Sequence, residues 1–322
     1  MDILISEDLH HPALDRLGEK FSLRRDPTLW ADPPRLQSEI SGARALLVRN
    51  QTQVTAALLQ GAPQLVGIGR VGVGLDNIDV AAASQLGIVV VAPLNANAVS
   101  VAELTFGFII ALARKIPAAD GSTKAGGWDR KGCTGIELEG KTLGICGFGR
   151  VGRLVASRAR AFGMRVLVFD PVLQGGSAGL SAGEAELCPE LEGLLASADF
   201  VSLHLPLTPE TRNLFDARRL AAMKRGSFLI NTSRGGVVDE RALIQALQDQ
   251  RLAGAALDVR ESEPPAARGL LETLPNVILT PHVGAFTIEA QRRTFEAVAE
   301  DLERLLTGQG AINSINLKTP KR

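Results

Sequence analysis

Short apolar runs alternate with longer amphipathic stretches along most of the 322 residues. The runs are continuous rather than alternating, which is typical of strands buried on both faces of a parallel sheet that helices cover. They fall into two groups on either side of a long apolar segment, so we predict an α/β chain with two doubly wound parallel sheets. The first group is "DILIS", "ARALLV", "QLVGIG" and "GIVVV", and the second is "KTLGIC", "RVLVFD", "DFVSLHL", "SFLINTS", "GAALDV" and "NVILT".

Two stretches are expected to form long helices that connect these groups. The segment "SVAELTFGFIIALARKI", residues 100–116, is predicted to cross from the first domain to the second and to end at Pro117, since proline cannot continue a helix. The amphipathic stretch from about Thr287 to Leu306 could then return to the first domain. The chain is long enough for two domains, each with its own core.

Charge and cysteine usage narrow the class of protein. Basic and acidic side chains number 35 each, so the formal net charge is zero and no general attraction to nucleic acid or an anionic membrane is expected. Cys133, Cys146 and Cys188 are scattered and fit neither a disulfide framework nor a zinc site, which favours a reducing cytoplasm and no metal. The N-terminal segment does not have a signal-peptide pattern, and the most apolar helix is too short to span a bilayer, so we expect a soluble protein.

The segment "GICGFGRVGRL" carries the strongest single motif. Gly147, Gly149 and Gly152 form a G-x-G-x-x-G pattern between a predicted strand and a predicted helix. In a dinucleotide-binding turn the first glycine permits the tight turn, the second lets the backbone approach a pyrophosphate, and the third lets helix and strand pack closely. Arg150 and Val151, inside the motif, would then lie at the helix N-terminus, which attracts phosphate.

A glycine triplet alone is equally compatible with an ordinary turn, but its context favours a Rossmann domain. Asp170 ends the next predicted strand, about where an acid reads the ribose of NAD and repels the extra phosphate of NADP. We therefore expect NAD as cofactor. Pro206, in "LHLPLT", is expected to line the same site.

Three further segments carry candidate chemistry. Arg234 in "NTSRGG" and His282 in "TPHVGA" both follow predicted strands, so both should face the ligand crevice at the carboxyl ends of the sheet. An arginine can hold a carboxylate with a planar fork of donors, and a histidine can exchange the proton that accompanies hydride transfer. Glu263, in "ESEPP", would favour the protonated histidine and orient it. Together the three would suit oxidation of a 2-hydroxy acid.

Each of these residues also has an ordinary interpretation. Taken alone, the arginine could form a surface ion pair, the histidine could be a loop residue, and the glutamate could simply be exposed. The other histidines are interpreted as structural: His10 and His11 as N-terminal loop residues, and His204 as a strand-end residue.

The order of motifs resembles the D-isomer-specific 2-hydroxyacid dehydrogenases, most closely the branch that oxidises phosphoglycerate. The likeness runs through "LLVRNQTQVT", "GRVGVGLDNIDV", "NANAVSVAEL", "GWDRKGCTGIELEGKTLGICGFGRVG", "INTSRGGVVDE", "GAALDV" and "PHVGA", nearly the whole chain. It implies that Arg234 binds the substrate carboxylate, that Glu263 supports His282, and that His282 is the catalytic acid–base. These three residues are the expected catalytic set.

The resemblance has further implications for the architecture and the site. It implies a flavodoxin-like substrate-binding domain from residues 1–96 and 285–322 around a Rossmann domain from residues 97–284, and a homodimer formed through the Rossmann domain and its "GWDRKGCTGIEL" arm. The site residues it adds are the backbone at Val73 and Gly74 for the carboxylate, Asn97 in the cleft, and Asp258 at the nicotinamide amide.

Substrate choice is expected to depend on Arg49 and Arg70, which follow predicted strands of the first domain. Such a pair could receive a 3-phosphate, although each could instead be an ordinary strand-end arginine. The sequence departs from the family pattern at Asn50, where serine is usual, and at Phe286, where "GAST" becomes "GAFT". No regulatory domain follows the catalytic motifs, so serine feedback through such a domain is not expected.

These observations predict NAD-dependent oxidation of D-3-phosphoglycerate to 3-phosphohydroxypyruvate, the entry to serine biosynthesis. A hydroxypyruvate or glyoxylate reductase is the nearest alternative, because it shares the catalytic residues and does not need Arg49 and Arg70. An NAD(H)-sensing corepressor-type binding protein on the same fold is the alternative from another class. A formate or phosphite dehydrogenase is less favoured, since nothing suggests a pocket for so small an anion.

Overall fold

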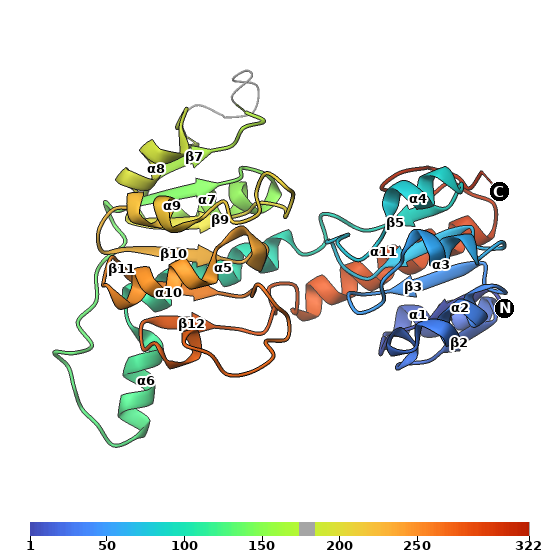
Figure 1. The fold of residues 1–322 in the computed structure, drawn as a ribbon, viewed down its shortest axis with the longest axis horizontal. Coiled ribbons are helices and arrows are strands. Elements are labelled where there is room, and N and C mark those ends of the chain that lie inside the picture. Colours follow the sequence, from blue (N-terminus) through green and yellow to red (C-terminus); the bar gives the residue numbers. More distant parts are fainter. Residues whose placement is uncertain (174–183, 322) are drawn as a thin grey trace. The chain divides into compact units, whose positions relative to one another are not determined.

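The computed structural model describes residues 1–173 and 184–321, and the chain divides into two compact units (Figure 1). One unit consists of residues 1–97 and 285–322, and the other of residues 98–284. Each unit is built on its own parallel sheet with helices on both faces, which confirms the predicted fold class.

The first unit has a five-stranded parallel sheet in the order β2-β1-β3-β4-β5. This is the flavodoxin-like doubly wound order. Its strands are β1 (Ile3–Ile5), β2 (Leu23–Arg25), β3 (Ala45–Val48), β4 (Gly67–Arg70) and β5 (Val89–Val91). Its helices are α1 (Pro12–Lys20), η1 (Leu29–Ala31), α2 (Pro33–Ile40), α3 (Ala56–Gln60), α4 (Val80–Gln85) and α11 (Ile288–Leu306).

Successive residues of the central strands pack on opposite faces of this sheet. Ile3 and Ile5 of β1 join a cluster with α1 and α11, whereas Leu4 joins the cluster that includes α2, α3 and α4. The long helix α11 packs along β4 (Figure 1). Burial on both faces explains why these strands are apolar without interruption. The edge strand β2 was not predicted, because its sequence "LRR" has no apolar run.

The second unit has a seven-stranded parallel sheet in the order β12-β11-β10-β9-β6-β7-β8. Counted from β6, this contains the dinucleotide-binding order 3-2-1-4-5-6 with one added strand. The strands are β6 (Thr142–Cys146), β7 (Arg165–Phe169), β8 (Glu186–Leu187), β9 (Phe200–Leu203), β10 (Ser227–Asn231), β11 (Leu252–Leu257) and β12 (Val277–Leu279). The helices are α5 (Ala98–Ala113), α6 (Ile116–Lys124), α7 (Arg150–Ala161), α8 (Leu191–Ser197), α9 (Ala217–Ala222), η2 (Gly235–Val237), α10 (Glu240–Gln248) and η3 (Leu271–Thr273).

Helices cover both faces of the larger sheet as well. One buried cluster joins α5 and α7 to the sheet, and the other joins α8, α9 and α10 to the opposite face. The strand order reverses between β6 and β9, which is where ligands bind in doubly wound sheets, beyond the carboxyl ends of the strands. None of the helices within the described residues is both long and apolar enough to cross a lipid bilayer.

The prediction that one helix runs to Pro117 is wrong. Helix α5 ends at Ala113, and Lys115 takes a left-handed conformation with φ of 52°. Pro117 lies in the first turn of α6, where its missing N–H group removes no intrahelical hydrogen bond. The proline therefore begins the second helix instead of ending the first.

Candidate active site

Of the three glycines after β6, Gly147 and Gly152 are required by the protein's own backbone, and Gly149 leaves open space beside it. Gly147 has φ of 93°, and a Cβ there would lie 2.4 Å from the carbonyl oxygen of His204. A Cβ on Gly152 would lie 2.3 Å from the carbonyl oxygen of Gly147, so only glycine lets α7 pack this closely on the turn. A Cβ on Gly149 would meet no atom within 4 Å, which leaves room for a ligand beside the backbone. These are the three roles of a dinucleotide fingerprint.

Asp170 connects the end of β7 to the fingerprint turn. Its Oδ2 accepts a hydrogen bond from the backbone N–H of Phe148 at 2.7 Å, and its Oδ1 accepts one from Val172 N–H at 2.9 Å. Gly149 caps the twelve-residue helix α7 without a side-chain hydrogen bond, so the helix N-terminus around Arg150 is suited to phosphate. An acid beside a phosphate-binding turn fits the ribose and pyrophosphate of NAD.

The loop after β10 places Arg234 at the carboxyl end of the sheet. The side chain of Asn231 accepts hydrogen bonds from Ser233 N–H at 3.0 Å and from Ser233 Oγ at 2.8 Å. Its Nδ2 donates to the carbonyl oxygen of Arg234 at 2.9 Å. A Cβ on Gly235 would lie 1.8 Å from the carbonyl oxygen of Arg260, so the loop can pass this neighbouring backbone only with glycine. The sequence "NTSRGG" therefore forms a tight turn that contains Arg234.

His282 and Glu263 meet although 19 residues separate them in the chain. The ring Nδ1 lies 2.6 Å from Glu263 Oε2, so Nε2 is the ring nitrogen that does not contact the glutamate. Burial alone would raise the pKa of Glu263, but hydrogen bonds from His282 and from the backbone of Arg260 outweigh it. With the charges of His282 and Arg234, the net effect lowers the pKa of the carboxyl. This arrangement orients the histidine and keeps its partner ionised.

A second, buried carboxylate holds the loop that carries this histidine. Asp258 Oδ1 accepts hydrogen bonds from Thr280 Oγ1 at 2.5 Å and Val283 N–H at 2.8 Å, and Oδ2 accepts one from Gly284 N–H at 2.8 Å. The backbone N–H of His282 donates to the carbonyl oxygen of Asp258 at 2.8 Å. These bonds hold His282 in a left-handed conformation with φ of 55°. Contact between Asp258 and a nicotinamide amide stays a prediction.

The predicted substrate-binding residues lie in the first unit. Arg49 directly follows β3, whereas Arg70 is the last residue of β4 and so lies within the strand. These strands are neighbours, with Val48 in register with Arg70, so both arginines lie at the carboxyl ends of adjacent strands. The Nη1 of Arg70 donates to Val71 O at 2.9 Å. Val73 and Gly74 lie in the loop after β4, and Asn97 is the last residue before α5.

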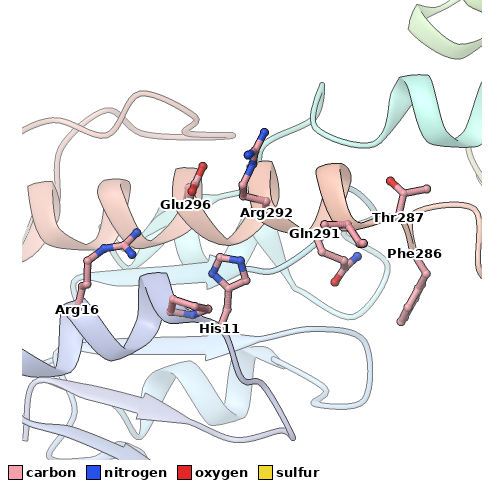
Figure 2. A pocket seen from close by; sticks show the side chains of 9 residues that line it. His11, Arg16, Phe286, Thr287, Gln291, Arg292 and Glu296 are labelled. Carbon is pink, nitrogen blue, oxygen red and sulfur yellow. The ribbon is translucent and has the colours of Figure 1, made fainter.

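Some residues around Arg49 were not identified from the sequence. Its guanidinium contacts Gln291 and Phe286, and its backbone contacts the buried Glu7. Figure 2 shows Phe286 and Gln291 near the start of α11, beside a hollow of about 510 Å³ that His11 and Arg16 also line. The hollow includes none of the predicted catalytic residues. Of these contact residues, only Phe286 could have been noticed in the sequence, because it departs from the family pattern.

The other histidines have structural surroundings. Nδ1 of His11 accepts a hydrogen bond from Ala13 N–H at 3.1 Å and so caps α1, while its ring stacks on Phe295. Burial lowers the pKa of His204 to about 3, and its Nε2 lies 2.9 Å from Ser202 Oγ. A histidine that stays neutral across the physiological range is unsuited to acid–base work. Pro206 follows the same strand and is exposed.

Comparison with known proteins shows the family to which the chain belongs. Residues 106–284 match the family model "D-isomer specific 2-hydroxyacid dehydrogenase, NAD binding domain". Over 98% of its length the chain is 45% identical to D-3-phosphoglycerate dehydrogenase from Methanocaldococcus jannaschii, but it spans only 59% of that relative. It is 43% identical to (S)-sulfolactate dehydrogenase from Chromohalobacter salexigens, with 95% of this chain and 98% of the relative covered.

A solved structure extends the likeness to the whole fold. The NADPH-dependent glyoxylate/hydroxypyruvate reductase from Sinorhizobium meliloti superposes with a TM-score of 0.88 at 29% identity, covering 100% of this chain and 98% of the other. Both units, and not only the dinucleotide-binding one, therefore match. The chain belongs to the D-isomer specific 2-hydroxyacid dehydrogenase family, and residues 106–284 are its NAD-binding domain.

Proposed function

We propose that this chain oxidises a D-2-hydroxy acid with an anionic group on C3, namely D-3-phosphoglycerate, to the 2-keto acid. The observation that carries the proposal is the 2.6 Å contact between His282 Nδ1 and Glu263 Oε2 in an NAD-binding domain. A histidine oriented in this way, with an arginine on a nearby loop, supplies the proton acceptor and the carboxylate anchor that this reaction needs.

Each protein group has a defined task in the proposed reaction. Arg234 binds the substrate carboxylate through its fork of N–H donors, assisted by the backbone of Val73 and Gly74. His282 removes the hydroxyl proton through Nε2, and Glu263 stabilises the resulting imidazolium. NAD, which the fingerprint turn and Asp170 would hold, would supply the acceptor for the hydride from C2. In the reverse direction the protonated His282 acts as the acid.

Arg49 and Arg70 are proposed to bind the group on C3. They lie at the carboxyl ends of two neighbouring strands, and two cations suit a phosphate that carries a charge of about −1.5 to −2 at pH 7. Asn97 completes the proposed substrate site. The charge argument favours phosphate over an uncharged hydroxymethyl group, as in glycerate, because only the phosphate brings negative charge to the two guanidinium groups.

A sulfonate is the second candidate for this group, because the chain covers nearly the full length of the sulfolactate dehydrogenase. The (S) label does not exclude a shared stereochemistry. A carbon that bears sulfur outranks a carboxyl group in the naming rules, so (S)-sulfolactate and D-3-phosphoglycerate place their carboxyl, hydroxyl and hydrogen identically. The same Arg234 and His282 would therefore serve both substrates.

The test is the rate of NADH oxidation by the purified chain with a panel of keto acids. 3-Phosphohydroxypyruvate, 3-sulfopyruvate, hydroxypyruvate and glyoxylate are compared by kcat/KM. The proposal expects the phosphorylated acid to be preferred, whereas preference for sulfopyruvate moves the function to sulfolactate, and preference for an uncharged C3 moves it to a hydroxypyruvate or glyoxylate reductase. Absence of turnover with all four would favour an NAD(H)-sensing binding protein.

The variant Arg70→Ala distinguishes a phosphoglycerate dehydrogenase from a hydroxypyruvate or glyoxylate reductase. Loss of a charge-assisted hydrogen bond is worth about 1.5–3 kcal/mol, so kcat/KM for 3-phosphohydroxypyruvate should fall roughly 10- to 100-fold. Hydroxypyruvate turnover should change little. An equal fall for both acids would contradict a phosphate role for Arg70, and Arg114→Ala, in the other unit, is a control for loss of a cation.

We also propose a preference for NAD over NADP and assembly as a homodimer. The carboxylate of Asp170 beside the fingerprint turn would repel a 2′-phosphate, so kinetics with NADPH test the first point. For the second, none of the nine residues of α6 is buried and Trp128 is 81% exposed, as expected for an arm that a second copy covers. The molar mass in solution tests it.

A further inference from the structure

The guanidinium of Arg49 is contacted by Gln291 of α11 and by Phe286, which lies two residues before that helix. Its Nη2 donates a hydrogen bond to Gln291 Oε1 at 3.0 Å, and its Cζ lies 4.3 Å from the centre of the Phe286 ring. The Nε2 of Gln291 donates to Ala285 O at 2.8 Å, which turns the amide oxygen toward the arginine. All four residues belong to the first unit.

The backbone of Arg49 is fixed by a separate set of contacts. Glu7 is only 3% exposed, and its carboxylate accepts hydrogen bonds from four consecutive backbone N–H groups, those of residues 49–52, at 2.8 to 3.2 Å. The side chain of Asn77 donates to the carbonyl oxygens of Arg49 at 3.3 Å and Thr52 at 2.7 Å. The loop is therefore anchored, and the remaining freedom of Arg49 lies in its long side chain.

Phe286 and Gln291 restrict that remaining freedom in complementary ways. A ring stacked on the guanidinium restrains the tilt of the plane, and a hydrogen bond at one edge restrains rotation within it. Within the described residues, Gln291 is the only hydrogen-bond acceptor for this guanidinium, which has five N–H groups. Most of its donors thus stay available while its orientation is set.

Phe286 has no other evident task. It is 56% exposed, so it contributes little to the core. It occupies the position where the family motif "GAST" has serine. Figure 2 shows its ring directed away from α11, while Gln291 extends from the same helix. An exposed aromatic ring that covers a cation is more readily explained by the cation than by packing.

We infer that Phe286 and Gln291 are positioning residues that hold Arg49 ready for the anionic group on C3 of the substrate. The inference rests on the proposed function, in which Arg49 binds that group. Holding a flexible side chain in its bound orientation removes part of the entropy cost of binding, and arginine is among the side chains with the most rotamer freedom to lose. The effect should appear in KM for substrates that carry the anion and in no others.

Phe286→Leu tests the inference, with Phe286→Tyr as the variant that keeps a ring. Cation–π contacts at exposed sites correspond to roughly a two- to five-fold change in an equilibrium constant. Phe286→Leu should therefore raise KM for 3-phosphohydroxypyruvate by that factor with kcat and KM for hydroxypyruvate unchanged, and Phe286→Tyr should restore the parent values. Ile288→Ala, at an 85% exposed neighbour, should have no effect.

A measurement independent of turnover separates this inference from the proposed function. In ¹⁵N-labelled protein, the Nε–H signal of Arg49, assigned by its loss in Arg49→Ala, should be ordered in the parent and in Phe286→Tyr and mobile in Phe286→Leu. Equal order in all three, or equal changes in KM for both keto acids, would overturn the positioning role. If the parent instead shows no preference for phosphorylated or sulfonated acids, the proposed function fails, and the order of the Nε–H signal still decides whether Phe286 holds Arg49.

Discussion

Two loops, one in each unit, carry a proposed functional side chain; both are held by a buried carboxylate, and they differ in what contacts that side chain. In the second unit the buried carboxylate of Asp258 accepts hydrogen bonds from the loop that carries His282. In the first unit the buried carboxylate of Glu7 accepts hydrogen bonds from the loop that carries Arg49. When a buried, fully hydrogen-bonded carboxylate fixes the backbone of a loop, the Cα position of the side chain on that loop is fixed as well.

The difference lies in the contacts made by each side chain. His282 meets an ionisable group, Glu263, whereas Arg49 meets an amide and an aromatic ring, neither of which titrates. The first arrangement allows protons to move and makes the chemistry depend on pH. The second keeps a permanent cation oriented without a directly hydrogen-bonded counter-ion, which leaves its charge for a ligand. The contrast fits the proposal that proton transfer belongs to one unit and recognition of a second anion to the other.

The strongest test of this contrast is His282→Ala. General acid–base catalysis contributes about 10²–10⁴-fold, so kcat should fall by that factor, with a smaller change in substrate affinity. Steady-state kinetics with the preferred keto acid measure it. His10→Ala is a matched control, because its Nε2 lies 3.1 Å from Asp8 on the surface in a similar histidine–carboxylate pair. A variant of His282 with nearly parental kcat would show that this loop does not carry the proton.

Glu263→Gln should have the next largest effect. The amide keeps the size of the side chain but not the charge that stabilises an imidazolium, and a hydrogen bond to a charged group is worth about 1.5–3 kcal/mol. We expect kcat to fall roughly 10- to 100-fold. The control is Glu261→Gln, two residues away in the same exposed loop. Parental kcat in Glu263→Gln would remove the glutamate from the mechanism.

The same variant has a signature in stability as a function of pH. Because the pKa of Glu263 is lowered in the folded protein, its ionised form stabilises the fold above the ordinary glutamate pKa of about 4.3. That contribution is lost as pH falls through the lowered value. The melting temperature of the parent should therefore fall more steeply than that of Glu263→Gln below about pH 4. Parallel curves would show that the carboxyl gains nothing from its partners in the fold.

The sequence predicted most of the fold because strands buried on both faces require continuous apolar runs. It did not predict β2 or β8, whose sequences "LRR" and "EL" are short and polar at the edges of their sheets. The end of α5 was misplaced because proline is favourable in the first turn of a helix as well as unfavourable in its interior. Local rules thus identify elements better than their ends.

Some residues of the candidate site could be predicted from the sequence, and others could not. Arg234, Glu263 and His282 each belong to a recognisable local segment, so motif order could select them. The contacts of Arg49 with Glu7 and Gln291 join residues 42 and 242 positions apart, and neither partner lies in a motif. A single polar residue gives no periodic signal, and its partner is set by tertiary packing. Residues that hold functional groups are therefore harder to predict than the groups themselves.

Glu7→Gln tests the recognition side of the comparison and should have the smallest effect on turnover. Oε1 of Glu7 accepts from residues 49 and 52, and Oε2 accepts from residues 50 and 51, so an amide in either orientation leaves two backbone N–H groups facing an NH₂. An unsatisfied buried donor costs about 1–3 kcal/mol, which urea denaturation should record as a lower free energy of unfolding.

The kinetic consequence of this variant distinguishes a loop that recognises the second anion from one that only supports the fold. If the loop presents Arg49, KM for 3-phosphohydroxypyruvate should rise a few-fold while kcat and KM for hydroxypyruvate stay near the parental values, since His282 and Glu263 lie in the other unit. Asp8→Asn, at the exposed neighbouring position, should change neither stability nor KM. Loss of stability with no change in either KM would leave Glu7 as a purely structural carboxylate, because Arg49 would then not depend on the loop that carries it.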